Sequence, residues 1–242
     1  MNAHSSWLAK SKIAHRGLHD EHAPENTLAA FEKAIQKGYA IELDARQISD
    51  DTIVVYHDKS LCRLTGCDGY TAGLEKTALD DLKICNTNHT IPTLQQVLDF
   101  VDGRTPLLIE IKNDTMDGKF EKDLLALLGN YKGDFAVQSF NPYSLEFCKK
   151  LAPQILRGQL ATKFDRTDKH TKQERKKLNK LKMLKISEPH FLAYDVRFLP
   201  NKFVTKARKK GTLLLGWTIG STQDYERAKD LVDNIIFEGY EA

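Results

Sequence analysis

The sequence predicts an α/β protein, a TIM-type (β/α)8 barrel with a small insertion after the second strand region. Strand-like and helix-like patterns alternate along almost the whole chain, which is typical of a parallel sheet built from βαβ units. About eight such units fit into the 242 residues, and closed barrels commonly have this length. These two observations favour a closed barrel over an open, doubly wound sheet.

Short runs of apolar and β-branched residues that end in loops predict the strands. They are 12–16, 39–46, 52–57, 106–112, 134–140, 154–161, 191–197, 212–219 and 234–238. Helical patterns lie between most of them, at 26–37, 93–102, 117–129, 143–151, 168–184, 201–210 and 222–232. Asn26 or Thr27 can cap the first helix, and Gly38 closes it.

A single domain of residues 1–242 is expected, because no linker, low-complexity tract or sequence repeat interrupts the pattern. Residues 59–92 lack a clear period and are too long for a simple βα loop, so we interpret them as a small insertion. The chain ends four residues after the last predicted strand, at 234–238. The usual eighth helix is therefore expected to be missing or replaced by the N-terminal segment.

Composition and charge exclude several classes of protein. The chain is 41% hydrophobic and 29% charged, and its net charge of +3 is too small to indicate a nucleic-acid partner. The four cysteines show no CxxC spacing, so free thiols in a reducing compartment are expected. No apolar run has the length of a signal region or a membrane span. We expect a cytoplasmic enzyme or binding protein without stable membrane insertion, and its oligomeric state stays open.

Acidic residues on two predicted strands form the first candidate site. Alternate side chains of 39–46 share a face, so Glu42 and Asp44 point away from the neighbouring apolar side chains. Glu110 has the same orientation in 106–112, so all three carboxylates would face the inside of a barrel. Three such groups repel one another unless a cation lies between them. Oxygen ligands alone suit Mg²⁺ or Ca²⁺ rather than Zn²⁺.

The same strand ends carry imidazoles and cations. His15 and His57 each close a predicted strand and can form an acid–base pair near neutral pH, although a lone histidine is more often structural. Arg16 and Lys112 can bind phosphate oxygens. In the alternative interpretation, Lys112 and Arg46 simply neutralise the carboxylates. Taken together, the groups suit the metal-assisted cleavage of a phosphate ester.

The motifs that carry these residues resemble, in order, those of the glycerophosphodiester phosphodiesterase family. They cover most of the chain, and the combination is specific although each piece alone is weak. The matching pieces are HRG at 15–17, PENT at 24–27, ELD at 42–44, VVYHD at 54–58, the R-x-T of CRLTG, IPTL at 91–94, IEIK at 109–112, QSF at 138–140 and GWT at 216–218.

The resemblance implies a barrel with a small insertion in the region of 59–92. It implies a divalent cation, Mg²⁺ or Ca²⁺, on Glu42, Asp44 and Glu110, and acid–base roles for the two histidines, His15 and His57. Family members cleave glycerophosphodiesters to glycerol 3-phosphate and an alcohol. Attack by the glycerol hydroxyl of the substrate, giving a cyclic intermediate, is one possible first step, and which histidine is the base stays open.

Four residues are candidates for substrate binding. By the resemblance, Arg16 and Lys112 contact the phosphate. Glu25 of PENT can hold the Arg16 side chain, and its alternative interpretation is an acid in the first turn of a helix. Trp217 can line the pocket over the glycerol, and a buried core tryptophan is an equal alternative.

Some features depart from the family pattern or leave a choice. Asp51 stands where the family usually has the glycine of an Asp-Gly turn. The basic run 163–185 is interpreted as a solvated helix face, with a basic rim for anionic substrates or a membrane surface as its alternative.

Two other functions are considered: a phospholipase D-like enzyme acting on lysolipids, and a catalytically silent barrel that binds a phosphoester. A small-molecule phosphodiester is the expected partner.

Overall fold

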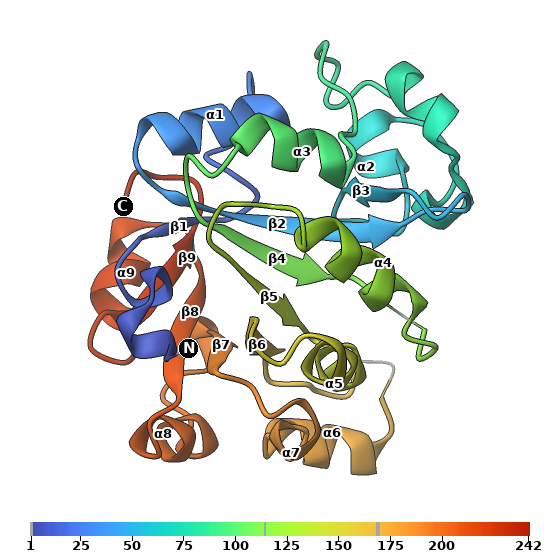
Figure 1. Ribbon diagram of the computed structural model, residues 1–242. Helices are drawn as coiled ribbons and strands as arrows, with labels where there is room; N and C mark the ends of the chain where they lie inside the picture. The colour runs from blue at the N-terminus through green and yellow to red at the C-terminus, as the bar shows by residue number, and fades with distance from the viewer. Residues whose placement is uncertain (1, 114, 168–169) are drawn as a thin grey trace. The chain divides into compact units, whose positions relative to one another are not determined.

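A computed structural model describes residues 2–113, 115–167 and 170–242 (Figure 1). The chain divides into two compact units. The first unit is Ile13–Phe135, and the second is Ala136–Ala242 together with the N-terminal segment up to Lys12. Among the described residues, no helix combines the length and the apolar character that crossing a bilayer requires.

The first unit is built on the strand β2 (Ala40–Gln47). β1 (Ile13–Ala14) and β4 (Leu107–Ile111) both pair with β2 in parallel. β3 (Ile53–Val55) pairs antiparallel with the last residues of β2, which corrects the expectation of parallel strands only. The reason is the short turn between β2 and β3, since so few residues can join only antiparallel strands.

Three helices of the first unit follow its predicted pattern. They are α1 (Leu28–Gln36), α3 (Leu94–Val101) and α4 (Lys119–Leu128). The Thr27 side chain caps α1 by accepting a hydrogen bond from the Ala30 amide at 3.3 Å. Thr93 and Gln96 form a capping box at the start of α3. α1 packs on β2, α3 packs on β3, and the two helices lie side by side (Figure 1).

The expected insertion at 59–92 has short helices joined by irregular loops, in agreement with its lack of period. They are α2 (Cys62–Thr65) and two 3₁₀ turns at Thr71–Gly73 and Lys76–Asp81. Its apolar side chains make a core with residues in and around β3. The cluster consists of Ile48, Val54, Tyr56, Leu61, Leu64, Leu79, Ile84 and Ile91.

The strands that follow form a parallel sheet. They are β5 (Phe135–Ser139), β6 (Leu156–Ala161), β7 (Phe191–Asp195), β8 (Leu213–Ile219) and β9 (Asn234–Phe237). The helices between them are α5 (Pro142–Leu151), α6 (Lys172–Asn179), α7 (Leu184–Ser187), α8 (Lys202–Lys209) and α9 (Thr222–Ala228), with a 3₁₀ turn at Val196–Phe198.

The prediction of one continuous helix over 168–184 is wrong. Its positions 168 and 169, which also belong to the basic run, lie outside the described residues. The remainder is split into α6 and α7, with Leu181 between them at a left-handed φ of 52°. Leu181 and Met183 are buried there, so the chain leaves the helical path where turning inward covers two apolar side chains.

The N-terminal segment carries two 3₁₀ turns, Ala3–Ser5 and Trp7–Ala9. The Asn234 side chain of β9 donates hydrogen bonds to the carbonyl oxygens of Leu8 at 2.8 Å and Ser11 at 2.7 Å. This segment therefore lies against β9.

Candidate active site

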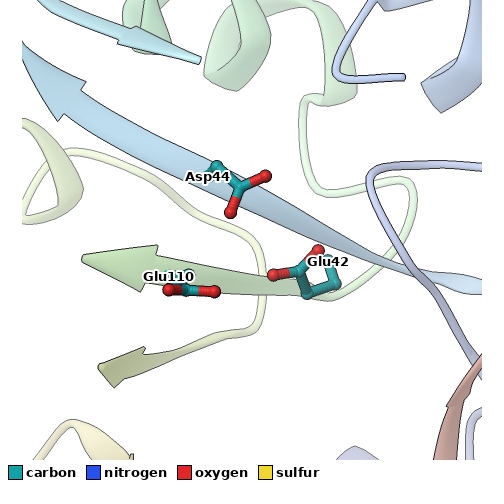
Figure 2. Close-up of side chains that lie close together, drawn as sticks. All are labelled: Glu42, Asp44 and Glu110. Atoms are coloured by element: carbon teal, nitrogen blue, oxygen red, sulfur yellow. The ribbon is translucent and has the colours of Figure 1, made fainter. Parts of the chain in front are cut away.

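Three buried carboxylates meet on neighbouring strands of the first unit. Asp44 of β2 lies directly across from Glu110 of β4, and Glu42 is two residues earlier on the same face. The exposed fractions of Glu42, Asp44 and Glu110 are 1%, 0% and 7%. One oxygen from each lies within 4.8 Å of the other two, and Figure 2 shows the carboxyl groups gathered between the strands. The structure thus brings together the residues that strand alternation predicts.

Cations and an amide surround this cluster. Lys112 Nζ lies 2.7 Å from Glu110 Oε1 and 3.2 Å from Asp44 Oδ1. Arg16 Nε lies 3.3 Å from Asp44 Oδ2, which also accepts a hydrogen bond from Asn26 Nδ2 at 2.8 Å. The alternative interpretation, in which Lys112 neutralises the carboxylates, is therefore correct in part, because Lys112 pairs with Asp44 and Glu110. Three acids nevertheless share Lys112 and Arg16.

The carboxyl groups respond to this crowding in opposite directions. Burial, followed by the charges of Asp44 and Glu110, raises the pKa of Glu42 well above its ordinary value. Burial also raises the pKa of Glu110 to about 6. For Asp44, the charge of Lys112 and then that of His57 outweigh burial and lower the pKa. Without a further cation, the cluster favours retaining a proton on a glutamate.

The residues present fit a divalent cation. All three donors are carboxylate oxygens, the ligands that Mg²⁺ and Ca²⁺ prefer. Asp44 Oδ1 is fully buried, and within the described ranges 2–113, 115–167 and 170–242 its charge contact is the Lys112 ammonium at 3.2 Å, which makes no hydrogen bond to it and also serves Glu110. A buried carboxylate oxygen without a hydrogen bond costs free energy. A cation among the three acids would add positive charge that Lys112, shared between two of them, does not supply.

The HRG turn places Arg16 beside the acids. Arg16 and Gly17 take left-handed φ values of 57° and 82°. A Cβ on Gly17 would lie 2.8 Å from the carbonyl carbon of Ala30, so the close approach requires glycine. The backbone N–H of Arg16 then donates to Glu42 Oε2 at 3.1 Å. The turn that presents the guanidinium is thereby joined to the acidic cluster.

Glu25 holds Arg16, as the PENT motif suggests. Arg16 Nη1 donates to Glu25 Oε1 at 2.6 Å. The alternative, an acid in the first helical turn, is wrong because α1 begins only at Leu28. The neighbouring Asn26 is not the N-cap, since Thr27 has that role. The side chain of Asn26 bonds to Asp44, a contact that the sequence analysis missed.

The charges of both candidate histidines affect the pKa of Asp44. His15 follows β1 directly, and His57 comes two residues after the end of β3 at Val55. The charges of His57 and His15 are among those that lower the pKa of Asp44. Burial lowers the pKa of His57 itself, against the opposing charge of Asp44.

An aspartate orients the His57 ring. His57 Nδ1 lies 2.6 Å from Asp58 Oδ1. The pKa of Asp58 is lowered to about 2, because its hydrogen bond with Arg63 outweighs burial. An ionised carboxylate only accepts, so Nδ1 carries the proton and Nε2 is free for proton exchange. Arg46, considered above as a partner of the acids, donates to the His57 carbonyl at 2.9 and 2.7 Å.

Trp217 lies on β8 in the second unit. Its ring is partly buried and meets Phe140 edge-on, with the ring centroids 5.6 Å apart. This contact is compatible with a core tryptophan and with a pocket wall. The substrate-binding role of Trp217 therefore stays a prediction.

A buried acidic cluster that fits a divalent cation, beside imidazoles and cations, is typical of enzymes that cleave phosphate esters. Residues 15–238 match the family model described as the Glycerophosphoryl diester phosphodiesterase family. The chain belongs to this family. The predicted family is confirmed, and with it the predicted class of enzyme.

Two curated relatives illustrate the likeness. The chain is 29% identical over 249 residues to a glycerophosphodiester phosphodiesterase of Caldanaerobacter subterraneus subsp. tengcongensis, covering 93% of this chain and 92% of the relative. It is 36% identical over 164 residues to the uncharacterized protein YqiK of Bacillus subtilis, and this match covers 62% of this chain and 66% of YqiK.

A solved structure shares the fold. It is that of a phosphodiesterase from Oleispira antarctica in complex with the product sn-glycerol-3-phosphate. The TM-score is 0.79 at 25% sequence identity, over 94% of this chain and 92% of the relative. The predicted TIM-type (β/α)8 barrel is thus confirmed as the fold class.

Proposed function

We propose that this chain hydrolyses glycerophosphodiesters to glycerol 3-phosphate and an alcohol, with Mg²⁺ or Ca²⁺ held by Glu42, Asp44 and Glu110. The observation that carries the proposal is the set of three buried carboxylate oxygens within 4.8 Å of one another, in a member of this family. The bound product of the Oleispira relative, sn-glycerol-3-phosphate, supports the class of substrate.

The cation and the positive side chains have complementary tasks. A divalent ion at the three carboxylates would offset negative charge on the phosphate oxygens. Arg16 and Lys112, both within 3.3 Å of Asp44, bring two further positive charges to the same place. Glu25 holds the Arg16 guanidinium, so that its orientation is set before substrate arrives.

The imidazoles move the protons. One ring takes the proton of the attacking hydroxyl and the other protonates the leaving alcohol. When water attacks, glycerol 3-phosphate forms directly; when the glycerol hydroxyl of the substrate attacks, a cyclic phosphate forms, and a water molecule then opens it to glycerol 3-phosphate. His57 exchanges its proton at Nε2, because Nδ1 donates to Asp58. His15 is the proposed second ring, directly after β1. Trp217 is proposed to line the glycerol pocket, and the enzyme is proposed to work in the cytoplasm on a small-molecule substrate.

A coupled assay for glycerol 3-phosphate tests this proposal. Purified protein is given several water-soluble glycerophosphodiesters with Mg²⁺, Ca²⁺ or EDTA. We expect release of glycerol 3-phosphate with a divalent cation, loss of activity in EDTA, and loss in His15→Ala. Turnover that survives both EDTA and His15→Ala contradicts the mechanism. Preference for a micellar lysolipid supports the phospholipase D-like alternative, and calorimetric binding without turnover supports the silent barrel.

A further inference from the structure

Arg63 of α2 joins two carboxylates that come from separate segments of the first unit. Its Nε donates to Asp58 Oδ2 at 2.5 Å. Its Nη1 and Nη2 donate to Glu25 Oε2 and Oε1, each at 2.8 Å. The two terminal nitrogens of one planar guanidinium thus bind both carboxylate oxygens of Glu25, and its third nitrogen binds Asp58. Lysine has no such fork, so this geometry needs arginine.

Each of these carboxylates also holds a side chain of the proposed catalytic machinery. Asp58 Oδ1 lies 2.6 Å from His57 Nδ1, and Glu25 Oε1 accepts a hydrogen bond from Arg16 Nη1 at 2.6 Å. Arg63 is therefore the middle of a continuous chain that runs from the imidazole to the phosphate-binding guanidinium. Both carboxylates have lowered pKa values despite burial, and for both the hydrogen bond to Arg63 is the largest opposing cause.

We propose that Arg63 is a positioning residue, which fixes the tautomer of His57 through Asp58 and the direction of Arg16 through Glu25. Arg63 touches no reacting atom in this role. It keeps Asp58 ionised and aimed at Nδ1, so that Nε2 of His57 faces the substrate unprotonated when the ring is neutral. It keeps Glu25 in place, so that Arg16 meets the phosphate without reorganisation. This inference rests on the proposed function.

A purely structural role for Arg63 is the competing explanation, in which it fastens the 59–92 insertion to the rest of the unit. The insertion already has an apolar anchor, because Leu61, Leu64 and Leu79 pack with Tyr56 in a buried cluster. The Arg63 side chain is 47% exposed, which limits what its ion pairs add to stability, although Glu25 and Asp58 are only 12% and 21% exposed. In the absence of Arg63, Glu25 keeps its ion pair with Arg16. Removing Arg63 is thus expected to leave the insertion folded.

The kinetic test compares Arg63→Met with a matched variant. Arg104→Met removes an arginine of similar exposure, 41%, which pairs with Glu32 at 2.8 Å at the amino end of β4. We expect Arg63→Met to lower kcat, through His57, and to raise KM, through Arg16, with a combined loss of about 10- to 100-fold. Arg104→Met is expected to stay within about twofold of the wild type. Equal kinetics for the two variants overturn the proposal.

Rescue and non-additivity separate positioning from anchoring. Arg63→Lys keeps a positive charge and should recover only part of the loss, because an ammonium group cannot bridge both carboxylates. In an Asp58→Ala background, Arg63→Met should no longer lower kcat, since the route to His57 is already broken. Full activity in Arg63→Lys, or an undiminished kcat effect in the Asp58→Ala background, contradicts the proposal. Should Arg63→Met fail to fold, Arg63→Lys carries the same comparison.

A spectroscopic arm does not depend on turnover. ¹⁵N NMR of the imidazoles, assigned with His57→Gln, reports which ring nitrogen carries the proton. The wild type is expected to show a protonated Nδ1 at His57, and Arg63→Met a mixture of tautomers, with the resonances unchanged in Arg104→Met. An unaltered His57 signal in Arg63→Met overturns the positioning role. A wild type without any turnover refutes the proposed function instead, and the NMR result still decides the role of Arg63.

Discussion

The two units of the chain both bury polar side chains on their strands, but they satisfy them in different ways. In the first unit, the acids of β2 and β4 face one another, and the pKa values of Glu42 and Glu110 are raised. Lys112 is shared between Asp44 and Glu110 rather than paired with one of them.

In the second unit, the buried side chain of Arg157 on β6 donates its hydrogen bonds to backbone carbonyl oxygens. It donates to the carbonyl oxygens of Pro153 and Ile155, each at 3.1 Å. Carbonyl oxygens thus satisfy most donors of this buried guanidinium, although its Nε has no hydrogen-bond partner among the described residues. What distinguishes the first unit is the crowding of like charges, and this feature indicates a binding site.

The largest expected effect contrasts Glu42→Gln with Arg157→Met. The glutamine can still accept from the Arg16 amide but cannot supply a negative charge to a cation. We expect activity to fall by at least about 10²-fold, with stability unchanged or higher. Arg157→Met should behave oppositely, with near-normal activity and a stability loss of about 1–3 kcal/mol. Glycerol 3-phosphate assays and urea unfolding measure both, and matched behaviour of the two variants contradicts the distinction.

The pH dependence of stability sharpens the same contrast at Glu110. Its pKa is about 6 in the folded protein against an ordinary 4.5, so the folded state binds more protons than the unfolded chain in this window. Stability is therefore lost as the pH rises through about 6, by about 2 kcal/mol in total. In EDTA, Glu110→Gln should match the wild type near pH 4 and exceed it above about pH 7.

Urea unfolding of both proteins at several pH values measures this difference. Saturating Mg²⁺ or Ca²⁺ should reverse it, because only the wild type gains full stabilisation from the ion. A constant difference between Glu110→Gln and the wild type across the pH range is the contradicting result.

A third contrast compares two glycines with left-handed φ. Gly17 has φ 82° and no room for a Cβ against Ala30, whereas Gly211 in the second unit has φ 88° and nothing within 4 Å of that position. We expect Gly17→Ala to cost more than about 2 kcal/mol and to impair activity, because Arg16 must shift. Gly211→Ala should cost about 1 kcal/mol and leave activity intact. Thermal or urea unfolding checks both, and equal costs refute the steric argument.

The smallest effect concerns Asp51, the departure from the Asp-Gly turn of the family. It has a left-handed φ of 67°. Asp51→Gly relieves this backbone strain but loses an exposed ion pair with Lys119, so we expect a gain of up to about 1 kcal/mol without a change in activity. Asp51→Asn is the control, since asparagine tolerates the same backbone region. A clear loss of stability in Asp51→Gly is the outcome that contradicts this reasoning.

Much of the site could be predicted because strand alternation is a local property. Alternation alone places Glu42 and Asp44 on one face, and a parallel neighbour brings Glu110 beside them. The alternating elements likewise predict most strands and helices. Local pattern could not show the antiparallel pairing of β3 or the break between α6 and α7, since both depend on where the chain turns.

The contacts of Asn26 and Arg63 lie beyond local pattern as well. The sequence pattern predicts a helix cap at Asn26. In the structure, the turn that carries Asn26 instead brings its side-chain amide to Asp44. Arg63 belongs to an aperiodic segment, and its partners are 5 and 38 residues away in the sequence. The only available signal was its position in the R-x-T motif.

The most direct test of the central claim is calorimetric titration of Mg²⁺ or Ca²⁺ into EDTA-stripped protein. We predict one ion per chain in the wild type and in Arg157→Met, with affinity weakened at least about tenfold in each of the three carboxylate variants, Glu42→Gln, Asp44→Asn and Glu110→Gln. Binding that is equally tight in all five proteins would contradict the account.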